Sequence, residues 1–221
     1  MDSLPEAQAF LALSTTNVSD ALDRLGIAGA PLGIRPLWPG CKKIAGRAMT
    51  MRLIPEGKDS PVNGTLRAIG AAKAGEILVI DHGGRMDVNS GGGIAMFTAN
   101  RRGLAGVMID GVSRDVDECR EMGFPVYAKG VIQSSIRGRC AFGGHGVEAS
   151  LGGVRVRAGD LVMGDENGVV VVPQEAIPDV LRRAQELGRM EEQVKAWIRE
   201  GVDPVEAHER VRYDRATRQG G

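Results

Sequence analysis

The chain has 221 residues, of which 43% are hydrophobic and 25% charged, an ordinary balance for one soluble globular domain. Lysine plus arginine and aspartate plus glutamate each number 28, so no overall charge draws the protein towards nucleic acid or an anionic lipid surface. The three cysteines, Cys41, Cys119 and Cys140, have no paired spacing, which excludes a disulfide framework and a zinc-finger pattern.

Two further features bear on location and on ligand binding. The first six residues lack the basic and apolar regions of a signal peptide, and no apolar run approaches the roughly 18 residues that cross a membrane. We therefore expect a cytoplasmic protein with no membrane or nucleic-acid partner. Glycine is abundant, with 32 residues, and it clusters between apolar runs, where turns and close backbone approach to a ligand need it.

The N-terminal third is expected to be helical and then irregular. Residues 5–13 read as a helix, and a second helix is predicted over about 17–25, with N-cap candidates in 14–17. Gly26 is placed to end this second helix. The Gly/Pro-rich stretch from Gly29 to Gly40 is predicted to be a loop.

The middle of the chain alternates between strand and helix patterns. Strands are predicted over 46–54, 77–81, 105–110 and 125–129, and helices over 64–73, 91–102 and 115–122. The runs at 77–81 and 105–110 are almost continuously apolar, as in strands covered on both faces. This alternation predicts a parallel sheet with crossover helices.

The last part of the chain changes character. Residues 147–172 read as short strands joined by tight turns, including a turn at Gly159-Asp160 and a hairpin turn at 164–168. Residues 174–213 are charged and helical, with a thin apolar stripe. A helix of this kind is expected to pack across a neighbouring subunit or the domain surface.

The most informative segment runs from Asp110 to Asp115, DGVSRD, which leaves a buried strand and opens a helix. Arg114 and Asp115 are therefore expected at the carboxyl edge of the parallel sheet, where ligands bind in open α/β folds. The guanidinium can hold a carboxylate and the aspartate can ligate a hard divalent cation. The alternative is a helix-start aspartate favoured by the helix dipole, beside an arginine in a surface ion pair.

A second segment leaves the preceding strand as Asp81-His82, followed by Asp87 and by the glycines at 91–93. Glycines that enter a helix present free backbone amides, a site suited to a carboxylate or a phosphate. The alternative is a flexible glycine loop without a ligand. His82 is read as a loop residue rather than a proton carrier.

These segments together resemble the family of 4-hydroxy-4-methyl-2-oxoglutarate aldolase and the regulator of ribonuclease activity A. The resemblance spans roughly 17–175, and its most specific part is the stretch from Gly103 to Asp115 followed by Gly123-Phe-Pro-Val126. It implies a single domain over 1–221, with 174–221 as a helical C-terminal extension. The implied architecture is an α/β/β layered sandwich with a central, partly parallel sheet, like the swivelling phosphohistidine domain, assembled as trimers or hexamers.

The resemblance also implies a chemistry: metal-dependent aldol cleavage of a 4-hydroxy-2-oxo dicarboxylic acid to pyruvate, with oxaloacetate decarboxylation through the same enolate. Arg114 would hold the 2-oxo acid and Asp115 would anchor Mg²⁺ or Mn²⁺. Backbone groups of the helix-opening loop would bind the substrate carboxylate. A glutamate from a neighbouring subunit's C-terminal helix, Glu191 or Glu192, would assist the metal. The helix-opening loop that would bind the substrate carboxylate consists of Gly92, Gly93, Ile94 and Ala95.

One position departs from the family pattern. The aldolases usually carry an acid where this chain has Gly93, and that acid works in proton transfer. Asp87, or Asp81, is the substitute suggested by proximity in the sequence. The departure also keeps two alternatives open: a non-catalytic binding protein like the ribonuclease regulator, and a divergent lyase with a different 2-oxo acid substrate.

Overall fold

The computed structural model describes residues 5–211. Its centre is a mixed nine-stranded sheet in the order β1-β5-β4-β3-β2-β10-β11, with β6 beside β4 and β7 beside β2. The four central strands β5, β4, β3 and β2 run parallel, and β10 is antiparallel to β2. The strands of this sheet are β1 (Arg35–Pro36), β2 (Ile44–Ile54), β3 (Ile77–Asn89), β4 (Gly106–Ser113), β5 (Val126–Ala128), β6 (Gly130–Val131), β7 (Ala141–His145), β10 (Leu161–Asp165) and β11 (Gly168–Val172).

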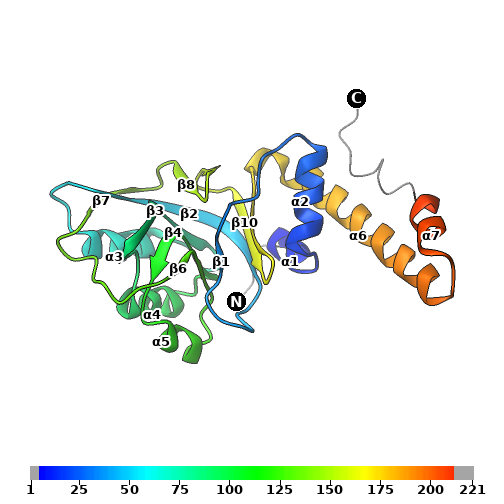
Figure 1. The fold of residues 1–221 in the computed structure, drawn as a ribbon. Helices are drawn as coiled ribbons and strands as arrows, with labels where there is room; N and C mark the ends of the chain where they lie inside the picture. The colour runs from blue at the N-terminus through cyan, green and yellow to red at the C-terminus, as the bar shows by residue number, and fades with distance from the viewer. Residues whose placement is uncertain (1–4, 212–221) are drawn as a thin grey trace.

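Helices cover one face of the parallel strands and a small hairpin covers the other (Figure 1). The hairpin pairs β8 (Ala149–Leu151) with β9 (Val154–Val156) and lies against β2, β3 and β4. This arrangement confirms the predicted α/β/β layering. The helices are α1 (Pro5–Leu11), α2 (Thr15–Arg24), α3 (Pro61–Ala71), α4 (Gly93–Arg101), α5 (Val116–Glu121), the short 3₁₀ helix η1 (Gln174–Ala176), α6 (Ile177–Arg199) and α7 (Pro204–Arg210).

The predicted strand–helix alternation holds because the apolar runs are buried as expected. Every residue of β4 is buried, as are the first six residues of β3. A second apolar cluster joins α1, α2 and the first half of α6 to β10 and β11, around Phe10, Leu22, Leu161, Val180 and Leu187. This second cluster and the buried strands β3 and β4 belong to one continuous sheet, which connects the layers around the candidate site.

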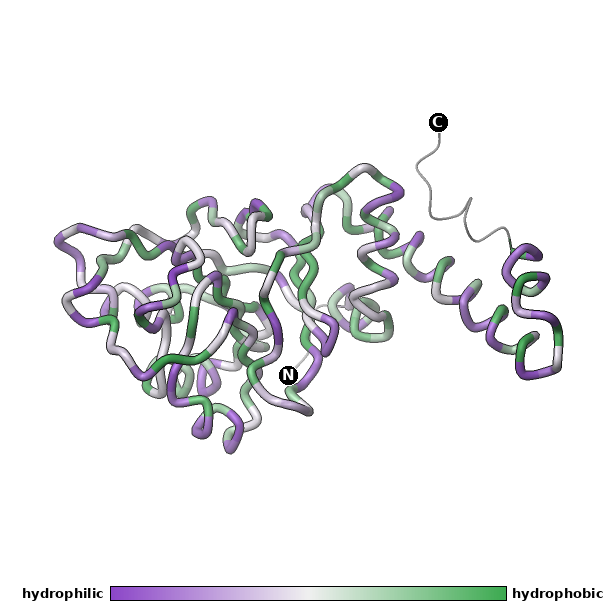
Figure 2. Tube along the Cα trace, viewed as in Figure 1, coloured by the Kyte–Doolittle hydropathy of each residue, from purple (hydrophilic) through white to green (hydrophobic). Residues whose placement is uncertain are grey.

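Beyond Leu187 the long helix α6 leaves the body of the protein (Figure 1). No residue of α6 after Leu187 is buried, and apolar and polar positions alternate along this half in Figure 2. The apolar side chain of Ile198 is 40% exposed. None of the helices in residues 5–211 is long and apolar enough to cross a membrane. The predicted helical tail extends to α7, and its end at 212–221 lies outside the described residues.

The structure corrects several expected boundaries. Strand β3 does not end at Asp81 but continues to Asn89, where a loop was expected. Gly83 and Gly84 have positive φ angles of 61° and 71°; the pairing with β4 shifts register there, and this irregularity breaks the apolar alternation that sequence reading relies on. The short strand β1 lies inside the expected loop 29–40, and α3 starts at Pro61 after the N-cap Ser60.

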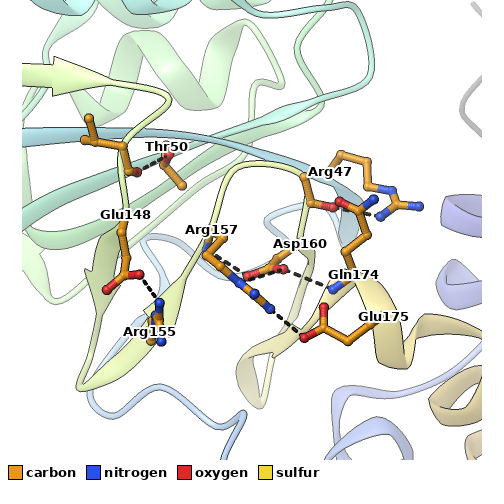
Figure 3. Close-up of polar contacts among 10 residues, drawn as sticks. Arg47, Thr50, Glu148, Arg155, Arg157, Asp160, Gln174 and Glu175 are labelled. Carbon is orange, nitrogen blue, oxygen red and sulfur yellow. Dashed lines mark hydrogen bonds and ion pairs between the residues drawn. The ribbon is translucent and has the colours of Figure 1, made fainter.

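The side chain of Asp160, in the turn before β10, links that turn to the start of the C-terminal helices at Gln174 (Figure 3). Asp160 is 3% exposed and accepts hydrogen bonds from the backbone amides of Arg157, at 2.7 Å, and Gln174, at 3.0 Å. Arg157 also pairs with Glu175 at 2.7 Å. A buried carboxylate satisfied in this way fixes the start of η1, and with it the direction in which α6 departs.

Candidate active site

Asp115 begins α5 in an unusual backbone conformation. Its φ of 56° lies in the left-handed region, and no other non-glycine residue in the described part of the chain has a positive φ. The carboxylate makes no capping hydrogen bond to α5. It accepts instead from the backbone amide of Gly93 at 2.7 Å, across the gap to the start of α4. An αL aspartate held away from its own helix is the kind of local strain that accumulates at functional sites.

Arg114 lies beside this carboxylate. Its Nε is 3.3 Å from Asp115 Oδ2, but the atom is buried and the contact lacks hydrogen-bond geometry. A Cβ on Gly92 would come within 2.7 Å of Asp115 Oδ2 and 2.9 Å of Arg114 Nε. Gly92 is therefore needed for the loop to approach both side chains.

Backbone contacts hold the glycine loop against the end of β4. The Ser113 hydroxyl donates to the Gly91 carbonyl at 3.0 Å, and the Ser90 amide donates to the Val112 carbonyl at 2.8 Å. Behind the loop, His82 Nδ1 lies 2.8 Å from the Ser90 hydroxyl, and burial lowers the pKa of His82. His82 therefore supports the loop from inside the protein, and it lies in β3 rather than in a loop.

Around this loop the structure forms a pocket of about 260 Å³. Its lining includes apolar side chains of α3 and Ile136 (Val62, Leu66 and Ile136) and charged side chains (Arg114, Asp115 and Glu118). The carboxamide of Asn89 also lines the pocket; its Oδ1 is buried and has no partner within the described residues. Two residues that line the pocket, Asn89 and Arg114, thus each carry a buried polar atom without a hydrogen-bond partner, which marks the pocket as a candidate polar site.

The four predicted loop residues all lie at the pocket, but their backbone amides differ in whether they already have a hydrogen-bond partner. Gly92, Gly93, Ile94 and Ala95 all line the pocket together with Arg114 and Asp115, as the sequence predicts. The Gly93 amide is occupied by Asp115, so at this helix start the amides of Ile94 and Ala95 are the ones left without an intrahelical partner.

The acids suggested as substitutes for the missing one at position 93 lie elsewhere. Asp87 is outside the pocket lining and accepts two hydrogen bonds from Arg85, at 2.7 and 3.0 Å, which lower its pKa. Asp81 is buried and accepts from the backbone amides of Gly83 and Ser150. Asp87 therefore lies in the extended part of β3 and pairs with Arg85 rather than lining the pocket, and its role as the acid stays a prediction.

Glu191 and Glu192 lie on the second half of α6, outside the pocket of their own chain. Glu191 Oε2 accepts a hydrogen bond from the Asn17 side chain at 3.0 Å, and Glu192 pairs with Lys195 at 2.8 Å. Both line a groove between α6 and the start of α2. Their assignment to a neighbouring subunit's metal stays a prediction.

Sequence reading overlooked Glu118 and Asn89. Glu118 lies in the first turn of α5, and its carboxylate meets Gly93 through tertiary packing, which the sequence pattern does not show. Asn89 lies in the part of β3 where the sequence predicts a loop, so it carries no signal either.

The donor set of the pocket fits a hard divalent cation. Among the described residues no group of three or more His, Cys, Asp or Glu side chains surrounds a common point. The pocket offers the carboxylate of Asp115, whose second oxygen makes no hydrogen bond within the described residues. Mg²⁺ is commonly bound by one or two carboxylates while it keeps several waters and takes further oxygens from the substrate.

Comparison with known proteins identifies the family of the chain. The aldolase/RraA family model ("RraA-like") matches residues 15–171. A Halalkalibacterium halodurans protein named "Putative 4-hydroxy-4-methyl-2-oxoglutarate aldolase" is 30% identical, with 90% of this chain and 91% of that protein covered. Legionella pneumophila protein DlpA is 30% identical over 96% of this chain, but the chain spans only 35% of that relative's length.

Solved structures with a similar fold include a member of the RraA family. An uncharacterized protein from Pseudomonas syringae pv. tomato has a TM-score of 0.83 and 28% identity, covering 94% of this chain and all (100%) of that one. Streptomyces coelicolor RraAS2, described as an unusual member of the RNase ES inhibitor RraA family, has a TM-score of 0.78 and 26% identity, covering 86% of this chain and 97% of that one. The chain belongs to the aldolase/RraA family.

Proposed function

We propose that this protein is a divalent-cation-dependent carbon–carbon lyase. Its substrate would be a 4-hydroxy-2-oxo dicarboxylic acid, cleaved by a retro-aldol reaction to pyruvate, with oxaloacetate decarboxylation as a side activity. The observation that carries the proposal is the pairing of Arg114 with Asp115 in one pocket, opposite the start of α4. A surface used only for contact with a partner protein has no need of this pair.

Arg114 is suited to hold the 2-oxo acid end of the substrate. Its Nε is buried without a hydrogen bond, and a carboxylate can satisfy a guanidinium in bidentate geometry. The free amides of Ile94 and Ala95 at the start of α4 would add donors in the same pocket. Arg137 on the pocket margin is a further cation for the distal carboxylate of a dicarboxylic acid.

Asp115, with Mg²⁺ or Mn²⁺ as its cation, is suited to the chemical step. When bound, the cation supplies Lewis acidity that favours the negative charge developing on the 2-oxo oxygen as the carbon–carbon bond breaks. Asp115 is held ready for it, because the Gly93 amide fixes one carboxylate oxygen at 2.7 Å. The apolar side chains of Val62, Leu66 and Ile136 would limit water around the developing charge.

The C-terminal helix suggests how the site could be completed. The half of α6 beyond Leu187 is not buried by its own chain, so a trimer or hexamer could cover it. In that assembly Glu191 or Glu192 of one copy would approach the cation of the next. Light scattering on the full chain tests this, and a monomer at micromolar concentration would contradict it.

Pyruvate release from 4-hydroxy-4-methyl-2-oxoglutarate and from oxaloacetate, with Mg²⁺ and with EDTA, tests the proposed function. We expect cation-dependent release from both substrates, lost in Asp115→Ala and retained in Glu121→Ala, which removes a carboxylate of α5 that does not line the pocket. Release that is insensitive to EDTA or to Asp115→Ala would contradict the assigned site. Release from neither substrate would favour a different 2-oxo acid or the non-catalytic binding protein.

A further inference from the structure

The carboxylate of Glu118 occupies the space that a side chain at position 93 would need. A Cβ built on Gly93 would lie 2.3 Å from Glu118 Oε2 and 3.1 Å from its Cδ. Because Oε2 is the tip of a flexible side chain, a side chain at position 93 would push the Glu118 carboxylate out of its present place. The backbone of Gly93 is not in the left-handed region, so the backbone does not require glycine there, and a side chain at position 93 would compete with Glu118 for the same space.

Glu118 is also the uncommitted carboxylate of the pocket. Asp115 accepts from the Gly93 amide and lies against Arg114. Within the described part of the chain, the side chain of Glu118 has no hydrogen bond and no ion pair, although it lines the same pocket. The carboxylates of Glu118 and Asp115 both approach Gly93, since a Cβ there would lie 2.3 Å from Glu118 Oε2 and 3.4 Å from Asp115 Oδ2.

We propose that Glu118 takes the proton of the substrate's C4 hydroxyl group, in place of an acid at position 93. The inference rests on the proposed lyase function and assigns the proton acceptor that this reaction requires. As Glu118 accepts the proton, the C4–O bond becomes a carbonyl and the C3–C4 bond breaks. The electron pair passes to C3 as the pyruvate enolate. Protonated Glu118 then returns its proton to C3, which gives pyruvate and restores the carboxylate.

If Glu118 has this role, its loss should slow the reactions of the two substrates to different extents. Oxaloacetate carries no C4 hydroxyl group, and its decarboxylation needs the enolate site alone. We therefore expect Glu118→Gln to lower kcat for cleavage of 4-hydroxy-4-methyl-2-oxoglutarate by about 10²- to 10⁴-fold. Oxaloacetate decarboxylation should stay within roughly threefold of wild type, since no interaction specific to its transition state is removed.

The competition for space between the two positions supplies a rescue experiment. Gly93→Asp alone should impair cleavage, because its side chain displaces the Glu118 carboxylate from its present place. Combined with Glu118→Ala, the same change brings a carboxylate back to the vacated space. The double variant should then exceed Glu118→Ala in hydroxy-acid cleavage by about tenfold, a coupling typical of residues in direct contact. The matched control, Glu121→Gln, should leave both reactions unchanged.

Mn²⁺ binding to the full chain, measured by calorimetry, provides a readout independent of turnover. Glu118→Gln should bind Mn²⁺ like the wild type and unfold at the same temperature. Equal loss of both reactions in Glu118→Gln, or unchanged cleavage of the hydroxy acid, overturns the assignment of Glu118 alone. Wild-type protein that releases pyruvate from neither substrate overturns the proposed function, and this inference with it.

Discussion

The backbone amide of Gly93 donates a hydrogen bond of 2.7 Å to Asp115 Oδ2, and this bond joins the start of α4 to the start of α5. The two helices follow neighbouring parallel strands, β3 and β4. The second oxygen of Asp115 has no hydrogen bond within the described residues. One carboxylate thus braces two helix starts and still presents an oxygen to the pocket.

The left-handed backbone conformation of Asp115 should lower the free energy of unfolding by a measurable amount. Asp115→Ala and Asp115→Gly both remove the carboxylate, but only glycine tolerates a φ of 56° without strain. We expect the glycine variant to be more stable than the alanine variant by about 1 kcal/mol. Urea unfolding of the two variants measures the difference. Equal stability would mean that the backbone relaxes once the carboxylate is gone.

Arg114 should be intolerant of lysine. Lysine keeps the positive charge but lacks the planar pair of donors that binds a carboxylate bidentately. We expect Arg114→Lys to lower kcat/KM for both substrates by about 10²-fold, because both share the 2-oxo acid end. Steady-state kinetics beside Arg120→Lys, an exposed arginine of α5 outside the pocket, checks the assignment. A lysine variant with wild-type KM would contradict substrate binding by Arg114.

The layered fold could be predicted from the sequence because its information is local. Strand β4 is buried along its full length, and its apolar run already indicated this. Arg114 and Asp115 could be placed at the sheet edge because the chain order of strand and helix fixes where they emerge. The same reasoning placed the glycine loop beside them.

The acid of the pocket could not be placed in the same way. Proximity in sequence favoured Asp87, but the register shifts in β3 after Asp81 extend that strand and turn Asp87 towards Arg85. Glu118 comes from a different helix and meets Gly93 only through tertiary packing. Bulges and contacts between distant segments leave little trace in hydrophobic periodicity.

Two glycines of α3 should respond in opposite directions to alanine. A Cβ on Gly64 would lie 2.1 Å from the ring of Phe142, whereas a Cβ on Gly70 meets nothing within 4 Å. We expect Gly70→Ala to stabilise the protein by about 0.5–1 kcal/mol through helix propensity. Gly64→Ala should destabilise it by about 1–3 kcal/mol through overpacking. Thermal unfolding of both variants measures the contrast, and a stabilising Gly64→Ala would show that Phe142 moves aside freely.

Asp165 should make stability depend on acid pH. Burial alone would raise the pKa of Asp165. Its carboxylate, however, accepts hydrogen bonds from the Thr15 amide at 2.8 Å, from the Thr15 hydroxyl at 2.7 Å and from the Asn167 amide. These bonds outweigh burial and lower the pKa below 3.8. Because the folded-state pKa is the lower one, this stabilisation is present above pH 3.8 and is lost as the pH falls through the folded value.

Asp165→Asn tests this dependence by removing the charge while keeping one acceptor oxygen. At pH 7 we expect a loss of about 1–2 kcal/mol in unfolding free energy, because hydrogen bonds to a charged acceptor are the stronger ones. The gap between variant and wild type should narrow as the pH drops below 3.8. Asp179→Asn, an exposed carboxylate of α6, serves as the control. A gap that stays constant with pH would show that the charge of Asp165 does not stabilise the join between α2 and the β10–β11 hairpin.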